Sequence, residues 1–284
     1  MHRGQKNLIW DKLSTLFLLT LLTPGSLLAA SLTVAGTGDS QALLRSIAKA
    51  YSTAHPSEKI VIPDSIGSRG GIRALTLGKV PMARIARPLK PNEAKPGLNQ
   101  HLFARSPVVI VLNPSVSGLS GLSSEQVVGI FSGRITRWED VGGPQGKIYV
   151  VEREAGDSSR SVLKKQMPDF KDFKPVGKVF FNTQQAADAI ASHANTIGFL
   201  PLSEAIQHNL SIMAVDGVQP NEASVQSGAY AYVTPFYLIS QGRPEGLALR
   251  FLDYIYSDAA QELIREASVI PVARQGPGPA GATE

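Results

Sequence analysis

The 284-residue sequence contains no cysteine. Disulfide bonds are therefore excluded, and so is a lipid anchor attached through an N-terminal cysteine. Long apolar runs are also missing after the first thirty residues, because no later segment approaches the ~18 unbroken apolar residues of a membrane-spanning helix. With 43% apolar and 18% charged residues, the composition is that of a folded globular protein.

Familiar catalytic and metal-binding motifs are absent as well. The chain has neither the phosphate loop G-x-x-x-x-G-K-[ST] nor the nucleophile elbow G-x-S-x-G. Its five histidines are scattered and form no pair at the spacing of a zinc site. We therefore expect no metal and no cofactor. Lysine and arginine are spread along the chain without interleaved aromatic residues, which argues against nucleic-acid binding.

Residues 1–30 have the pattern of a secretory signal peptide. A basic start precedes an apolar stretch at residues 16–22, and Leu28-Ala29-Ala30 resembles a cleavage site. The apolar stretch is too short to span a bilayer of ~30 Å, although an uncleaved anchor is the alternative. We expect an unlipidated protein in the periplasm. Removing three basic residues and one acidic residue with this segment lowers the formal net charge from +5 to +3.

The rest of the chain alternates strand-like and helix-like segments, which predicts an α/β fold. An apolar run at residues 107–114, bounded by prolines, predicts a strand buried on both faces. A second apolar and aromatic strand is predicted at residues 230–240, followed by helices at 245–256 and 258–267. The Gly/Pro-rich tail, residues 275–284, is predicted to be disordered.

Three turns share one form, in which a strand leads into a Gly/Ser/Thr-rich loop and then into a helix. They lie at residues 36–40, 65–71 and 156–160. A helix N-terminus presents unpaired N–H donors and a partial positive charge, so each turn suits an anion. One such turn is weak evidence, because Gly-rich turns are common in α/β proteins. Three that converge would define an anion site at the carboxyl ends of the strands.

The third turn carries both a favourable and an unfavourable charge. Arg153 offers a planar donor fork that suits an oxyanion, whereas Asp157 has the same sign as the anion. At an effective dielectric near 20, two unit charges ~4 Å apart interact by roughly 4 kcal/mol, or about three powers of ten in affinity. Three alternatives follow: Asp157 caps the next helix, accepts the proton of a protonated oxyanion, or indicates a different ligand.

Six segments in a fixed order carry a family resemblance: GSRGGI at 67–72, ARPL at 86–89, IFSGRITRW at 130–138, REAGDSSR at 153–160, TIGF at 196–199 and the region 232–272. In this order and spacing they resemble the periplasmic phosphate-binding proteins of bacterial ABC transporters. The resemblance covers the whole chain after the signal segment.

The resemblance implies a type II periplasmic binding protein fold, with two α/β lobes that are each a mixed sheet flanked by helices. Lobe I would comprise residues 31–108 and 236–274, and lobe II residues 109–235, with crossover segments at 108–113 and 232–238. It also implies a monomer without catalytic activity. That monomer would bind inorganic phosphate or a related oxyanion and deliver it to an inner-membrane ABC permease.

Carried over residue by residue, the resemblance implies a ligand-binding set of Thr37, Gly38, Asp39, Ser40, Ser68, Arg69, Arg153, Asp157, Ser158 and Ser159. This chain departs from the family pattern at two places. Asp157 replaces a serine donor, and the carboxylate that accepts the ligand's proton, expected near Ala86-Arg87, is missing. Positive charge at the site is either restored by three further arginines, or their side chains are simply solvated: Arg69, Arg84 and Arg87.

Two rival functions belong to other classes. The altered turn at Asp157 would fit an exported scaffold or adhesion protein that kept the fold and lost the ligand. The hydroxyl-rich turns would fit a secreted hydrolase built from Ser158, His193 and Asp157. Neighbouring Asp and Ser cannot easily hold a histidine between them, which argues against the hydrolase.

Overall fold

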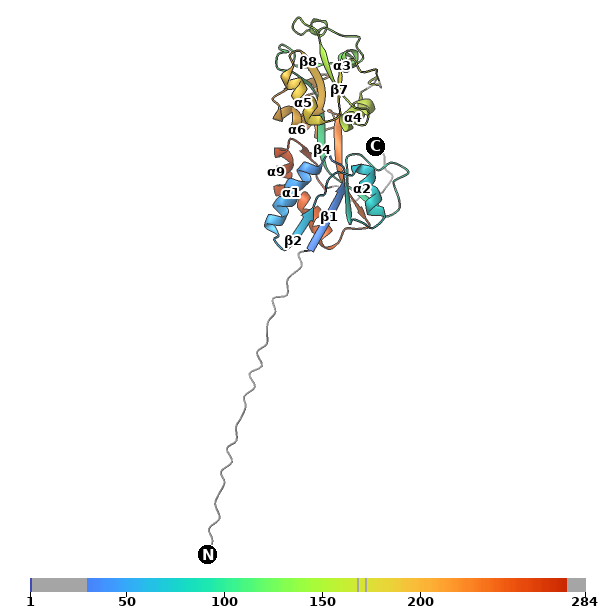
Figure 1. The fold of residues 1–284 in the computed structure, drawn as a ribbon, viewed down its shortest axis with the longest axis vertical. Coiled ribbons are helices and arrows are strands. Elements are labelled where there is room, and N and C mark those ends of the chain that lie inside the picture. The colour runs from blue at the N-terminus through green and yellow to red at the C-terminus, as the bar shows by residue number, and fades with distance from the viewer. Residues whose placement is uncertain (2–29, 168, 172, 275–284) are drawn as a thin grey trace.

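In the computed structural model, two α/β lobes lie end to end (Figure 1). The structure describes residue 1 and residues 30–167, 169–171 and 173–274. The predicted signal peptide falls almost wholly outside these residues, and the predicted disordered tail falls entirely outside them. Among the described residues, no helix has the length and apolar character needed to cross a membrane.

Lobe I contains the strand order β2-β1-β3-β11-β4, in which β1 pairs in parallel with β2 and β3, and β11 is antiparallel to β3 and β4. Helices cover both faces of this sheet, with α1, α8 and α9 packed in one core and α2 in another. The elements are β1 (Ala30–Gly36), α1 (Gln41–Ala54), β2 (Glu58–Val61), α2 (Gly67–Thr76), β3 (Met82–Ile85), β4 (Leu98–Leu112), β11 (Val233–Gln241), α8 (Gly246–Ile255), α9 (Asp258–Glu266) and β12 (Ile270–Pro271).

Lobe II continues the same sheet through β4-β8-β6-β7. Its two cores lie on opposite sides of these strands, one with α3 and α4 and one with α5 and α6. The elements are β5 (Gly121–Leu122), α3 (Ser124–Phe131), the 3-10 helix η1 (Trp138–Val141), β6 (Tyr149–Arg153), α4 (Ser158–Gln166), β7 (Lys178–Phe180), α5 (Thr183–Ser192), β8 (Thr196–Pro201), α6 (Leu202–Gln207), β9 (Ser211–Ile212), β10 (Ala214–Val215) and α7 (Glu222–Gln226).

Strand β4 passes from one lobe to the other between Pro107 and Val108. Pro107 pairs with Val233 of β11, whereas Val108 pairs with Pro201 of β8. The second crossing lies beside the first, because the Val108 N–H donates to the Tyr232 carbonyl at 2.8 Å. The buried strand predicted at residues 107–114 is therefore confirmed, although it begins earlier. The lobe boundaries at 108/109 and 235/236 stay predictions.

The glycine-rich segment at residues 67–71 differs from its prediction as a turn, because it forms the first part of α2. Close packing explains the difference. A Cβ on Gly71 would lie 2.8 Å from the Gly36 Cα and 2.9 Å from the Ala35 carbonyl oxygen. Glycine is a poor helix former by ~1 kcal/mol, but here it lets α2 lie against the end of β1.

Candidate functional site

The three predicted turns meet where the lobes face each other, at the ends of β1 and β6 and the starts of α1, α2 and α4 (Figure 1). The Ile66 N–H donates to the Gly36 carbonyl at 2.9 Å, which joins the second turn to the first. The Ser158 hydroxyl donates to Asp39 Oδ1 at 2.6 Å, which joins the third turn to the first. These residues are 119 positions apart, so the convergence is a tertiary result.

The first turn, residues 36–40, leads from β1 into α1. Thr37 and Ser40 are buried, whereas Gly38 and Asp39 are exposed. The Thr37 hydroxyl donates to Asp39 Oδ2 at 2.6 Å. The buried Ser40 hydroxyl has no hydrogen-bond partner among the described residues. The turn therefore holds one exposed carboxylate and one unused hydroxyl at the α1 N-terminus.

Arg84 supports this turn from beneath. Its side chain is fully buried, and its guanidinium donates to the carbonyl oxygens of Thr37 (2.8 Å), Pro63 (2.7 Å) and Val34, and to Gln41 Oε1 at 3.1 Å. Burial lowers the pKa of this guanidinium. From the sequence, Arg84 was expected either to be solvated or to restore positive charge at the site. Instead, its several donors fix the backbone of the first turn.

Arg153, the last residue of β6, lies beside Asp157 of the third turn; the Arg153 side chain is buried (5% exposed) and that of Asp157 is nearly so (9%). Arg153 donates from Nε (3.1 Å) and Nη2 (2.7 Å) to Asp157 Oδ2. The other carboxylate oxygen accepts the Arg160 N–H at 2.9 Å, so Asp157 caps α4. Of the three alternatives for Asp157, helix capping is the one observed. Arg153 Nη1 is buried without a partner among the described residues.

A buried ion pair lies directly behind this turn. Glu152 of β6 is fully buried and accepts from Arg160 Nη1, which ties β6 to α4. Burial raises the pKa of the Glu152 carboxyl, and the Arg160 charge opposes that rise. Arg160 also lies over the Phe170 ring, 5.8 Å from its centroid. The pair joins α4 to β6 and was not predicted from the sequence.

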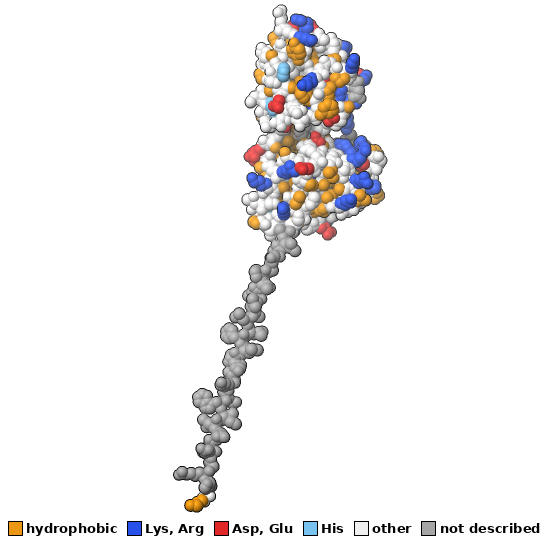
Figure 2. Space-filling model, in the orientation of Figure 1, with side chains coloured by type: hydrophobic (Ala, Val, Ile, Leu, Met, Phe, Trp, Pro, Cys, Tyr) orange, Lys and Arg blue, Asp and Glu red, His pale blue; other side chains and the backbone are white. Residues whose placement is uncertain are grey.

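The second turn contributes less charge to the junction than the sequence suggested. The half-buried Ser68 hydroxyl accepts the Ala86 N–H at 3.3 Å, and Arg69 is exposed. Arg87 is neutralised by Glu93, with N–O distances of 2.7 and 2.9 Å. Figure 2 shows basic side chains gathered over the α2 side of lobe I, where Arg69 and the exposed Arg73 lie.

The hydrolase constellation is not assembled. The Ser158 hydroxyl is bonded to Asp39, while His193 Nδ1 lies 3.0 Å from the Ala189 carbonyl oxygen at the end of α5. Within the described ranges, no group of His, Cys, Asp and Glu is arranged to hold a metal ion.

The fold and the converging turns define a two-lobe solute-binding protein. The family described as the PBP superfamily domain matches residues 23–259, and this chain belongs to that family. The predicted fold class and family are both confirmed.

Proteins named for phosphate binding are among its relatives. The chain is 26% identical over 248 residues to the phosphate-binding protein PstS of Bacillus subtilis, covering 86% of this chain and 81% of that protein. It is 23% identical to PstS of Borreliella burgdorferi over 220 residues, covering 74% and 78%.

Solved structures agree on the fold. An ABC-type phosphate transport receptor from Vibrio cholerae superposes with a TM-score of 0.70 at 23% identity, covering 85% of this chain and 99% of that chain. A Clostridium perfringens structure with bound phosphate has a TM-score of 0.73 at 24% identity, with the same coverage.

Proposed function

We propose that this chain is an exported phosphate-binding protein that delivers its ligand to an ABC permease. The observation that carries the proposal is the joining of three turns between the lobes, through hydrogen bonds of Ile66 to Gly36 and of Ser158 to Asp39. Beside the third turn lies Arg153, whose buried Nη1 has no partner within the described residues. Backbone N–H groups and a guanidinium at such a junction favour an oxyanion. The relatives named phosphate-binding protein PstS support phosphate as that oxyanion.

The proposed ligand site lies between the lobes and draws on both. Lobe I supplies the turn of Thr37, Gly38, Asp39 and Ser40, and Ser68 and Arg69 of α2. Lobe II supplies Arg153, Asp157, Ser158 and Ser159. The unused hydroxyl of Ser40 and Nη1 of Arg153 are buried donors for which a bound anion would provide an acceptor. An unpaired buried polar group costs about 1–3 kcal/mol, so such an acceptor would stabilise the fold.

The remaining features of the proposal concern the whole protein. Residues 1–30 would direct export, and the mature chain would act in the periplasm as an unlipidated monomer without catalytic activity. The formal net charge of +3 expected after cleavage suits an anionic ligand only weakly, so the site itself must provide the affinity.

Calorimetric titration of the mature protein with inorganic phosphate tests the ligand. We expect saturable binding that is lost in Arg153→Met, because that change removes the buried guanidinium of the proposed site and leaves the exposed Arg69 as its only arginine. Arg137→Met is the matched control, since Arg137 is an exposed arginine of the same lobe paired with Glu139. Wild-type protein that gives no heat at millimolar phosphate would overturn phosphate as the ligand.

One observation favours the scaffold alternative. Asp157 occupies two of the Arg153 donors, and Asp39 occupies the Ser158 hydroxyl, so much of the proposed site is already filled by the chain's own carboxylates. A protein that had lost its ligand would show this arrangement. Failure of phosphate, sulfate and arsenate alike to raise the melting temperature would support the scaffold function.

A further inference from the structure

Asp39 and Ser158 link the two lobes by a hydrogen bond at their junction. Asp39 lies just before α1 in lobe I, and Ser158 is the first residue of α4 in lobe II. The bond is 2.6 Å long, and the Thr37 hydroxyl donates to the other oxygen of the same carboxylate at 2.6 Å. Both donors belong to the turns that the proposed function assigns to the ligand.

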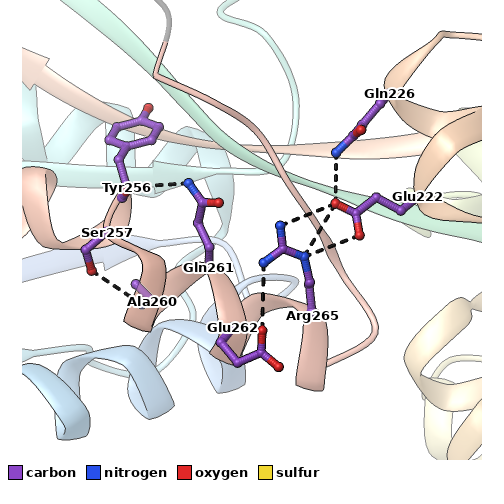
Figure 3. A network of polar contacts seen from close by, with 8 residues as sticks. All are labelled: Glu222, Gln226, Tyr256, Ser257, Ala260, Gln261, Glu262 and Arg265. Carbon is purple, nitrogen blue, oxygen red and sulfur yellow. Dashed lines mark hydrogen bonds and ion pairs between the residues drawn. The ribbon is translucent and has the colours of Figure 1, made fainter.

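A second polar link between the lobes lies away from this junction, near the strand crossings. Figure 3 shows Arg265 of α9 directed toward Glu222 of α7, with Glu262 on its other side. The Arg265 Nε lies 3.3 Å from Glu222 Oε2, and both side chains are about two-fifths exposed. Exposed pairs of this kind contribute about 0–1 kcal/mol. This pair therefore serves as a reference for a lobe contact outside the proposed site.

We propose that Asp39 is a tethered competing anion: its carboxylate binds the Ser158 end of α4 across the junction, closes the lobes without ligand, and must leave before an external anion binds. The inference rests on the proposed function, because the displaced groups are the proposed ligand donors. Asp157 likewise competes with an external anion within lobe II, since it accepts hydrogen bonds from Nε and Nη2 of Arg153.

The physical basis is competition for a limited set of donors. A hydroxyl has one proton to donate, so Ser158 cannot serve Asp39 and an anionic ligand together. Asp39 also adds a negative charge beside the site, which opposes the approach of an anion. A carboxylate tethered to lobe I is always at high effective concentration, whereas a free anion is not. The bond therefore favours the closed arrangement of the ligand-free protein and reduces its affinity for an external anion.

The first test measures lobe separation without any ligand. Because the chain has no cysteine, an exposed pair introduced as Thr53→Cys in α1 and Gln184→Cys in α5 can carry two spin labels. We expect the labelled wild-type background to show a short, narrow distance distribution. Adding Asp39→Ala or Ser158→Ala should broaden it toward longer distances, and the double change should add nothing further.

Two controls match these variants. Asp64→Asn removes one negative charge from the same lobe, where Asp64 is exposed and pairs with Arg45. Glu222→Gln weakens the contact of Glu222 with Arg265 between the lobes. Both should leave the distance distribution close to that of the parent. A distribution for Asp39→Ala that matches the parent would overturn the tether.

The second test titrates phosphate into the same proteins. Asp39→Ala should bind phosphate at least about tenfold more tightly than wild type, and Asp64→Asn should not. Equal affinities for Asp39→Ala and Asp64→Asn would overturn the competition. Wider lobe separation in Asp39→Ala, together with no phosphate heat in any variant, would support the tether while overturning phosphate as the ligand. The two proposals therefore fail by different results.

Discussion

Replacing Asp157 by asparagine separates the two roles of this residue. The observed carboxylate caps α4 through the Arg160 N–H and also pairs with Arg153. Asparagine is as good an N-cap as aspartate, so the helix start should be retained. The charge is lost, and the Arg153 guanidinium is left without a counterion. The variant should therefore change ligand affinity and stability in opposite directions.

The magnitudes follow from the burial of both groups. At an effective dielectric near 20, removing a unit charge ~4 Å from a bound anion relieves roughly 4 kcal/mol per unit of ligand charge. Asp157 is 9% exposed, so solvent screening reduces this value only in part. We expect Asp157→Asn to bind phosphate about two to three powers of ten more tightly than wild type. Without ligand, the unpaired Arg153 should lower the free energy of unfolding by about 3–5 kcal/mol.

Calorimetry and urea unfolding, each with and without phosphate, check both effects. Phosphate should restore the lost stability, because a ligand at 1,000 times its Kd adds about 4 kcal/mol. Asp188→Asn is the control, since it removes an exposed charge from lobe II that pairs with His208. Affinity in Asp157→Asn equal to or below that of wild type would refute the reasoning that the carboxylate opposes the ligand.

Three further predictions concern residues that stabilise the fold. Arg160→Met leaves the fully buried Glu152 without its partner and should lower the free energy of unfolding, measured in urea, by about 3–5 kcal/mol. An unchanged free energy of unfolding would contradict this prediction. Gly71→Ala should weaken phosphate binding and lower the melting temperature, because its Cβ would lie 2.8 Å from the Gly36 Cα in the first turn. Gly78→Ala is the control: its Cβ would meet no atom within 4 Å, but its φ is positive, so it should lower only the melting temperature. Burial and the Glu58 hydrogen bond raise the pKa of Tyr51 from 10.0 to about 12. Stability should therefore be intact below pH 10 and fall as pH rises toward 12, and Tyr51→Phe should remove part of that fall in pH-dependent melting.

The α/β architecture and the helix starts were predictable from the sequence, because they depend on local patterns. Ser123 and Ser257 lie just before apolar helical runs and accept N–H donors at the starts of α3 and α9. The proline-bounded apolar run at residues 107–114 predicted a buried strand, since only a strand covered on both faces is apolar throughout. The turns at residues 36–40 and 156–160 were recognised in the same way, from their Gly and Ser residues, whereas residues 67–71 proved to be helical.

Charge partners were less predictable, because they depend on which distant groups the fold brings together. Nothing in the sequence indicated that Arg84 is fully buried against four acceptors, one of them 50 residues away. The sequence left three alternatives for Asp157, and only the structure shows its carboxylate capping α4 through the Arg160 N–H while it accepts from Arg153.

The sequence by itself determined the family, the alternation of strands and helices, and the residue types available to an anion site, since each depends on local order along the chain. Tertiary structure alone decided that the three turns converge and that two of the chain's own carboxylates occupy them. The bond between Asp39 and Ser158 spans 119 residues and two lobes. No local pattern encodes such a contact, because its formation depends on how the lobes close.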